Sequence, residues 1–277
     1  MDKLYVKDVN QKFFINGGLE LSNNDSSIPK FIFIIPYRDR EQQLIFFKRH
    51  MKYILEDFFE TNYKIIFVHQ KDNRSFNCGA MKNIGFLIVK DLFPNSYENI
   101  TLVFNDVDTL PFSKGFINYQ TNKGVIKHFY GFKHALGGIV SINAGDFEKI
   151  NGFPNFWAWG YEDNMFQDRA IKNRLIIDRA QFYPFADKNI LHFYDGYLKQ
   201  VNKTEFERYV NHTIEGIDSI QNLVYSFNEE TDLYDITKFN TGTEENRKTT
   251  KIHDLHNGTV PFNHIRSNRG ASMPLFL

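Results

Sequence analysis

The chain has 277 residues and a mass of 32.7 kDa, enough for one α/β domain with a sizeable core or for two small domains. Hydrophobic residues make up 42% and charged residues 24%. These values are typical of globular proteins and exclude disordered, collagen-like and coiled-coil chains. The 33 basic and 33 acidic side chains cancel, so the overall positive charge typical of nucleic-acid-binding proteins is absent. We therefore expect no nucleic-acid partner.

The cysteine content and the N-terminal sequence indicate where in the cell the protein is located. Cys78 is the single cysteine and cannot form a disulfide within the chain, which argues against a secreted disulfide scaffold. Residues 1–8 carry charges where a signal peptide needs an apolar run, and no stretch approaches the roughly 20 apolar residues of a membrane helix. The sequence predicts a cytoplasmic protein without a transmembrane segment.

The first half of the chain alternates between apolar strands and helical patterns. Short β-branched and aromatic runs predict buried strands at 31–35, 65–68 and 101–104. Between them, residues 41–56 and 80–92 carry apolar side chains at helical spacing. Strand–helix–strand–helix–strand order predicts an α/β fold with a central, mostly parallel sheet flanked by helices.

The second half is less regular. The sequence predicts strands at 137–142 and 190–193, helices at 144–150 and 162–172, and a long helix or helix pair at 203–227. We expect one main domain over residues 29–238. Residues 1–28 are expected to form an N-terminal appendage, and the polar residues 239–277 a poorly packed tail in which 273–277 could dock back.

Two carboxylates follow the predicted strand 101–104. Asp106 and Asp108 point the same way if the extended backbone continues. Ligands of open α/β sheets bind beyond the carboxyl ends of strands, and paired carboxylates there suit a divalent cation that bridges diphosphate oxygens. The alternative is a solvated turn.

Both tryptophans of the chain lie within Phe156–Tyr161, directly before Glu162 and Asp163. Flat aromatic faces stack on the apolar faces of sugar rings, and adjacent carboxylates can bind a hydroxyl or remove its proton. The alternative is a buried aromatic cluster at a helix start, where acidic residues favour the helix dipole.

Three further side chains are candidates. Arg38 and Arg40 follow the first predicted strand, where two guanidinium groups could clamp a phosphate or a nucleotide; the alternative is a surface ion-pair loop. His192 could be a metal ligand or a structural histidine. The sequence has neither a Gly-Xaa-Gly-Xaa-Xaa-Gly motif after the first strand nor a Gly-Lys-Ser/Thr phosphate loop, which disfavours dinucleotide oxidoreductases and P-loop NTPases.

An ordered set of motifs resembles the β-1,4-galactosyltransferases, glycosyltransferase family 7. The resemblance runs from about Phe31 to Lys238. The motifs that carry it are Phe33–Arg40, Phe76-Asn77, Asn83–Phe86, Asn105–Asp108, Gly137-Gly138 and Asn151–Asp163.

The resemblance implies a fold, a reaction and a set of site residues. The family has a glycosyltransferase-A type α/β nucleotide-binding sandwich and transfers a sugar from a UDP donor with inversion, using Mn²⁺. Its members act on glycan acceptors, here an oligosaccharide, polysaccharide or glycoprotein. The implied UDP and donor contacts are Arg38, Arg40, Phe76, Asp106, Trp159, Ala135 and Gly138. The implied metal ligands are Asp108 and His192, with Glu162 binding acceptor hydroxyls and Asp163 as the catalytic base.

Four positions depart from the family pattern. Cys78 replaces an arginine on the donor side, which predicts weaker UDP binding. Asn189 replaces a metal-binding methionine, and its harder oxygen would relax the preference for Mn²⁺ toward Mg²⁺. Asn164 replaces an acidic residue. Ala135 stands where galactose-specific members carry a tyrosine, which predicts that an N-acetylated donor sugar is tolerated.

Two functions follow from this resemblance. The first is an inverting, metal-dependent transferase that moves galactose, N-acetylgalactosamine or N-acetylglucosamine from a UDP-sugar to a glycan hydroxyl. The alternative is a nucleotide-sugar- or glycan-binding protein on the same fold that has lost turnover. The lack of a membrane anchor and of the animal enzymes' cysteines suggests a bacterial or viral member, located in the cytoplasm or, if viral, in the host cytoplasm or the virion.

Overall fold

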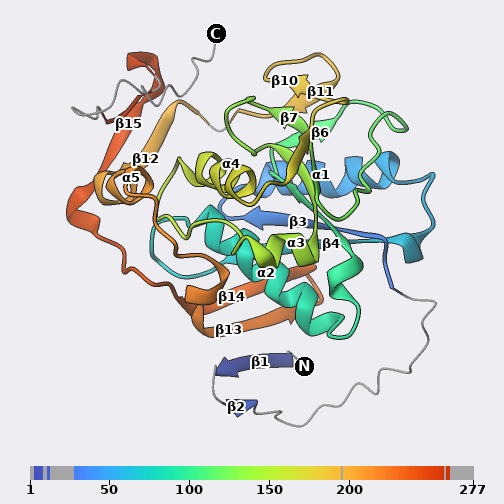
Figure 1. Ribbon diagram of the computed structural model, residues 1–277, viewed down its shortest axis with the longest axis horizontal. Coiled ribbons are helices and arrows are strands. Elements are labelled where there is room, and N and C mark those ends of the chain that lie inside the picture. Colours follow the sequence, from blue (N-terminus) through green and yellow to red (C-terminus); the bar gives the residue numbers. More distant parts are fainter. Residues whose placement is uncertain (1–2, 9–10, 13–27, 195, 259, 263–277) are drawn as a thin grey trace.

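The computed structural model describes the backbone of residues 3–8 and 11–12 and all of residues 28–194, 196–258 and 260–262 (Figure 1). One large mixed sheet forms its centre. The strands lie in the order β10 (Tyr183–Pro184), β7 (Val125–Gly131), β8 (Ile139–Asn143), β5 (Thr101–Asn105), β3 (Phe31–Tyr37), β4 (Tyr63–Gln70), β14 (Leu233–Asn240), β13 (Gln221–Asn228), β1 (Lys3–Asp8) and β2 (Gln11–Lys12), with β9 (Ile176–Asp178) paired to β7.

The middle of this sheet is parallel. β3 pairs with β4 on one side and β5 on the other, so that Phe31 lies opposite both Tyr63 and Thr101. Helix α1 (Glu41–Ile54) connects β3 to β4, and α2 (Cys78–Leu92) lies between β4 and β5 in the chain. The predicted alternation of strands and helices is confirmed. β8 is antiparallel to both β5 and β7, which makes the sheet mixed.

Alternate residues of β3 face two separate hydrophobic cores. Ile32 and Ile34 pack into the core that contains α2, whereas Phe33 and Ile35 pack into the core that contains α1. A strand buried on both faces needs apolar residues at every position, which explains the continuous run in the sequence. Gly85 lets α2 approach β3 closely, because a Cβ there would lie 2.3 Å from Ile34 Cγ2.

The remaining elements surround the sheet. The helices are α3 (Ala144–Lys149), α4 (Glu162–Lys172) and α5 (Lys203–Val210). Two small ribbons pair β6 (Thr109–Pro111) with β11 (Ile190–His192) and β12 (Leu198–Asn202) with β15 (Thr250–Asp254). The 3₁₀ turns are η2 (Glu60–Asn62), η3 (Tyr97–Asn99), η4 (Ile217–Ser219), η5 (Arg247–Thr249) and η6 (Leu255–Asn257). Within the described residues, no helix has the length and apolar character needed to cross a bilayer.

The predicted long helix at 203–227 is wrong. Only α5 is helical at its start, and a loop and the turn η4 lead into strand β13. Leu223 and Tyr225 are both buried in β13, and this spacing of two is that of a strand with one face toward the core.

The expectation of a poorly packed tail is also wrong for residues 239–258. β15 forms a ribbon with β12, and the backbone carbonyl of Thr243 accepts a 2.9 Å hydrogen bond from Trp157 Nε1. Glu245 Oε1 accepts a 3.1 Å bond from the Ser75 backbone N–H. The segment 273–277 lies outside the described residues. At the other end of the chain, residues 3–8 of the expected appendage join the main sheet by pairing with β13.

Candidate active site

The two aspartates predicted after the strand 101–104 lie at the carboxyl end of β5. The Asp106 N–H donates a 3.0 Å hydrogen bond to the Gly138 carbonyl, and Asn105 Nδ2 donates a 2.8 Å bond to the Thr109 carbonyl. These bonds fix the turn that leads from β5 into β6. The side chain of Asp106 is 34% exposed and that of Asp108 is 16% exposed, so both reach the surface of the site.

The pairing of β11 with β6 places His192 beside this turn. In that ribbon His192 lies opposite Thr109, and the Phe193 N–H donates a 2.8 Å bond to the Asp108 carbonyl. His192 Nδ1 is 3.2 Å from the Tyr130 hydroxyl. Asp108 and His192, 84 positions apart in the sequence, therefore lie on neighbouring backbone segments. An oxygen and an imidazole nitrogen suit a borderline cation such as Mn²⁺.

Within the part of the chain that the structure describes, no cluster of three or more Asp, Glu, His or Cys side chains is placed to hold a metal. A cation at Asp108 and His192 would need ligands from elsewhere, such as diphosphate oxygens. Asn189 Nδ2 donates a 2.9 Å bond to Asp187 Oδ1, so its amide is oriented by Asp187.

The two candidate arginines take different positions. Arg40 Nη1 lies 3.2 Å from Asp108 Oδ2, at the point where a diphosphate and its cation are expected. Arg38 donates through Nη1 to the Arg74 carbonyl, and its Nε lies 3.3 Å from Asp39 Oδ2. The surface ion-pair interpretation therefore describes part of the Arg38 environment, while Arg40 faces the acidic turn.

The two tryptophans of the aromatic loop have opposite roles in the structure. Trp157 is buried and stacks on Phe239, whereas Trp159 is partly exposed. The Trp159 N–H donates a 2.8 Å bond to the Gln200 carbonyl, and the Ala158 N–H donates a 3.1 Å bond to the Phe76 carbonyl. Thus Trp157 anchors the loop in the core, and Trp159 is the tryptophan that a ligand can reach.

Glu162 and Asp163 begin helix α4 directly after this loop. Glu162 is 9% exposed, and its Oε2 is buried without a hydrogen-bond partner among the described residues. Burial, with a further contribution from Asp163, raises the pKa of Glu162 to about 7. Burial also raises the pKa of Asp163, and Lys82 opposes that shift. The geometry confirms an adjacent acidic pair but places it in a partly desolvated setting.

Lys82, on α2, was not singled out by the sequence and lies at the centre of the site. Its Nζ is 3.0 Å from Asp163 Oδ1 and 3.7 Å from Asp106 Oδ1, and the side chain is 2% exposed. Burial alone would lower the pKa of the Lys82 amine, but Asp163 and the neighbouring acidic groups raise it well above its usual value. The sequence carries no local signal for this role, because α2 also contains the polar residues Asn83, Lys90 and Asp91.

Gly138 and Ala135 lie in the segment that contacts the acidic pair. Gly138 has φ +72°, and a Cβ there would lie 2.5 Å from the Tyr130 carbonyl oxygen. Ala135 is buried in the turn before it, and the next residue, Leu136, donates its N–H to the Asp163 carbonyl at 3.1 Å. Ala135 therefore lies beside the acidic pair. Its role as a wall of the donor pocket stays a prediction.

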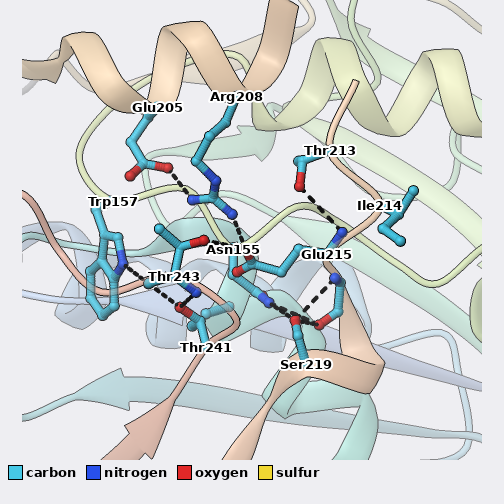
Figure 2. A network of polar contacts seen from close by, with 12 residues as sticks. Asn155, Trp157, Glu205, Arg208, Thr213, Ile214, Glu215, Ser219, Thr241 and Thr243 are labelled. Carbon is cyan, nitrogen blue, oxygen red and sulfur yellow. Dashed lines mark hydrogen bonds and ion pairs between the residues drawn. The ribbon is translucent and has the colours of Figure 1, made fainter. Parts of the chain in front are cut away.

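A second polar network lies beside the aromatic loop and is shown in Figure 2. Arg208 bridges the carboxylates of Glu205 and Glu215, and its guanidinium lies 5.3 Å from the centre of the Phe156 ring. The Thr243 hydroxyl donates a 3.1 Å bond to Glu215 Oε2. Burial raises the pKa of Glu205 to about 7.

Two family models match most of the sequence. Residues 4–120 match the model of the N-terminal region of glycosyl transferase group 7, and residues 125–195 match a second model, described as the N-terminal domain of galactosyltransferase. The chain belongs to this glycosyltransferase family. The family predicted from the motifs is thereby confirmed.

Individual relatives agree with this assignment. The chain is 30% identical over 167 residues to the xylosylprotein 4-β-galactosyltransferase of Caenorhabditis elegans, a match covering 56% of this chain and 55% of that protein. It is 26% identical over 245 residues to β-1,4-galactosyltransferase 5 of Mus musculus, covering 82% of this chain and 61% of that protein. The matches thus span just over half to about three-fifths of these curated relatives.

Two solved structures share the fold. The catalytic domain of Drosophila β-1,4-galactosyltransferase 7 in complex with xylobiose superposes with a TM-score of 0.62 at 21% identity, covering 78% of this chain and 96% of that one. A mutant of the same enzyme in complex with manganese, UDP-Gal and xylobiose gives a TM-score of 0.61 at 22% identity, with the same coverage. The predicted glycosyltransferase-A type fold is confirmed.

Proposed function

We propose that the protein is an inverting, metal-dependent glycosyltransferase that moves a hexose or N-acetylhexosamine from a UDP-sugar to a hydroxyl of a glycan. One observation carries the proposal. Lys82 connects Asp163, at the start of α4, with Asp106, at the carboxyl end of β5. A candidate base thus shares one site with the sheet edge at which nucleotides bind in α/β folds.

The acceptor side of the proposed reaction belongs to α4 and the aromatic loop. Asp163 would take the proton of the acceptor hydroxyl as that oxygen attacks the anomeric carbon. The neighbouring Glu162, which keeps a small exposed fraction, would bind a second hydroxyl of the acceptor through its carboxyl group. The partly exposed face of Trp159 would stack on a sugar ring.

The donor side belongs to β5, β6 and the residues after β3. Arg40 would bind a diphosphate oxygen, while Asp106, Arg38 and Phe76 would line the nucleotide site. Asp108 and His192 would hold Mn²⁺, with Mg²⁺ as the alternative. When bound, the metal supplies positive charge that stabilises the departing UDP.

The donor sugar and the acceptor are proposed from different observations. Ala135, buried beside the acidic pair, leaves more room than a tyrosine would, so we propose that UDP-GalNAc or UDP-GlcNAc is used in addition to UDP-Gal. Good use of UDP-Gal with equal rejection of both N-acetylated donors would refute this. A solved relative binds xylobiose, which makes that disaccharide the first acceptor to test. A cytoplasmic location stays a prediction, supported by the single cysteine.

Calorimetric titration of UDP into the full chain tests the donor site without a guess about the acceptor. We expect binding with Mn²⁺, weaker or equal binding with Mg²⁺, and none with chelator. Asp108→Ala should abolish metal-dependent binding, whereas Asp57→Ala, at an exposed ion pair with Lys114, should not. Transfer from UDP-Gal to xylobiose is measured next. UDP binding without transfer to any glycan acceptor would favour the binding-protein alternative, and no binding with either metal would refute the proposal.

A further inference from the structure

The site contains a buried cation that none of the proposed catalytic or binding roles uses. Lys82 lies on the inner face of α2 among apolar neighbours, with its Nζ 4.7 Å from the centre of the Phe153 ring. A buried ammonium group is costly unless paired charges and hydrogen bonds compensate it. Its compensation comes from two carboxylates on separate elements, Asp163 on α4 and Asp106 after β5.

We propose that Lys82 is a positioning residue for Asp163. Its ammonium group, which also contacts Asp106, holds the carboxylate of the base against the backbone of Gly137. The inference deepens the proposed function and rests on it. Lys82 is not itself a catalytic residue. Its side chain is only 2% exposed, so its ammonium group contacts the carboxylates and not the substrate.

The Asp163 carboxylate is confined at both oxygens. Oδ1 accepts a 3.0 Å hydrogen bond from Lys82 Nζ. Oδ2 packs over Gly137, where a Cβ atom would lie only 2.1 Å away. The backbone carbonyl of Asp163 accepts a 3.1 Å bond from the Leu136 N–H, which holds the two segments together. A base fixed in this way has little freedom to rotate away from an acceptor hydroxyl.

The surrounding charges make the lysine necessary for the ionised base. Asp106 faces Lys82 from the end of β5, Glu162 and Asp163 face it from α4, and the Cys78 thiol lies one turn earlier on α2. Without the ammonium group, three carboxyl groups would share a partly desolvated site, and repulsion would favour protonation of Asp163. A protonated carboxyl group cannot accept the acceptor's proton.

The test compares Lys82→Met with Lys90→Met. Lys90 is on the same helix and pairs with Glu148 away from the site, so it controls for loss of a lysine and an ion pair on α2. With UDP-Gal and xylobiose, we expect Lys82→Met to lower kcat about 100-fold with little change in the KM for UDP-Gal. The acid limb of the pH profile of kcat/KM should move about one unit higher. Lys82→Arg should restore part of kcat.

Two further variants keep the proposal testable. In an Asp163→Asn background, Lys82→Met should have almost no additional effect on rate, because the group that it positions is gone. If Lys82→Met does not fold, Gly137→Ala tests the same confinement with the lysine intact, since its Cβ must displace the Asp163 carboxylate. We expect that variant to lose about tenfold or more in kcat while UDP binding is kept.

A measurement without turnover separates this inference from the proposed function. Titration of the Asp163 carboxyl carbon by NMR, assigned from its loss in Asp163→Asn, should show a higher pKa in Lys82→Met than in the unmodified protein. An unshifted titration, or an unmoved acid limb with a kcat loss no larger than that of Lys90→Met, would overturn the role of Lys82. Absence of transfer and of UDP binding in the unmodified protein would instead overturn the proposed function and leave the NMR test in force.

Discussion

Two polar clusters lie next to the aromatic loop, and each places one cation between two carboxylates. In the Lys82 cluster (Lys82, Asp106 and Asp163), the cation is 2% exposed while the carboxylates are 34% and 25% exposed. In the Arg208 cluster (Arg208, Glu205 and Glu215), the side chains are 13%, 3% and 8% exposed. In the first cluster the cation is buried and the carboxylates are partly exposed to solvent. In the second cluster all three side chains are largely buried.

This difference in exposure suits the Lys82 cluster to ligand binding and the Arg208 cluster to structural support. Carboxylates that remain accessible above a buried cation can exchange their remaining contacts for those of a ligand. Arg208 instead uses its planar fork to bind two carboxylates at once and also lies over the Phe156 ring, so little of the cluster is left for a ligand. Substitutions in the two clusters should therefore affect different properties.

Asp163→Asn tests the Lys82 cluster and should have the largest effect. An amide cannot take a proton from the acceptor, so we expect kcat to fall at least about 10³-fold. Manganese-dependent UDP binding should remain, because the donor side is untouched. Steady-state transfer assays and UDP calorimetry on the same sample measure both properties. A variant that keeps more than a tenth of the activity would remove Asp163 from the role of base.

Arg208→Met tests the Arg208 cluster and should act on stability. It leaves Glu205 and Glu215 buried without their shared cation, which should lower the free energy of unfolding by about 3 kcal/mol. Below the unfolding transition, UDP affinity should change little. Chemical denaturation at pH 7.5 measures the stability. The comparison fails if Arg208→Met is as stable as the unmodified protein but inactive, since the cluster would then belong to the site.

Glu205→Gln gives a smaller effect with a defined pH dependence. The folded protein raises the pKa of Glu205 from 4.5 to about 7, so between these values the folded state holds a proton that the unfolded state releases. This group therefore contributes stability at low pH that is lost as the pH rises through 7. Relative to Glu205→Gln, the free energy of unfolding of the unmodified protein should fall by about 3 kcal/mol between pH 4.5 and 8. Parallel denaturation curves for the two proteins across this range would contradict the assignment.

Much of the fold was predictable because its central strands are buried on both faces. Such strands appear as continuous apolar runs, and the helices between them show a clear period, so 31–35, 65–68 and 101–104 were found directly. β13 was missed because Ile214, Ile217 and Ile220, in the loop and turn that separate α5 from β13, continue the helical spacing of apolar residues. β15 (Thr250–Asp254) was missed because Ile252 is its one apolar residue, so the segment has no alternating hydrophobic pattern.

The candidate site was predictable where its residues stand in motifs. Asp108 and His192 were expected to act together, and the β6–β11 ribbon places them on neighbouring segments. Lys82 could not be found in this way, because nothing local distinguishes a lysine that crosses the core from one that points to solvent. Its role depends on α4 and β5, which the chain brings to α2 only through the tertiary fold.

The link between the aromatic loop and the end of the chain has a practical consequence. The Trp159 N–H donates to the Gln200 carbonyl, and Gln200 is paired with Ile252 of β15. Ending an expression clone at residue 246, within the polar region that begins at 239, would remove β15, the strand that pairs with β12. Such a shortened protein would keep every recognisable motif of the family and still lose the support of Trp159, the tryptophan proposed to stack on a sugar ring.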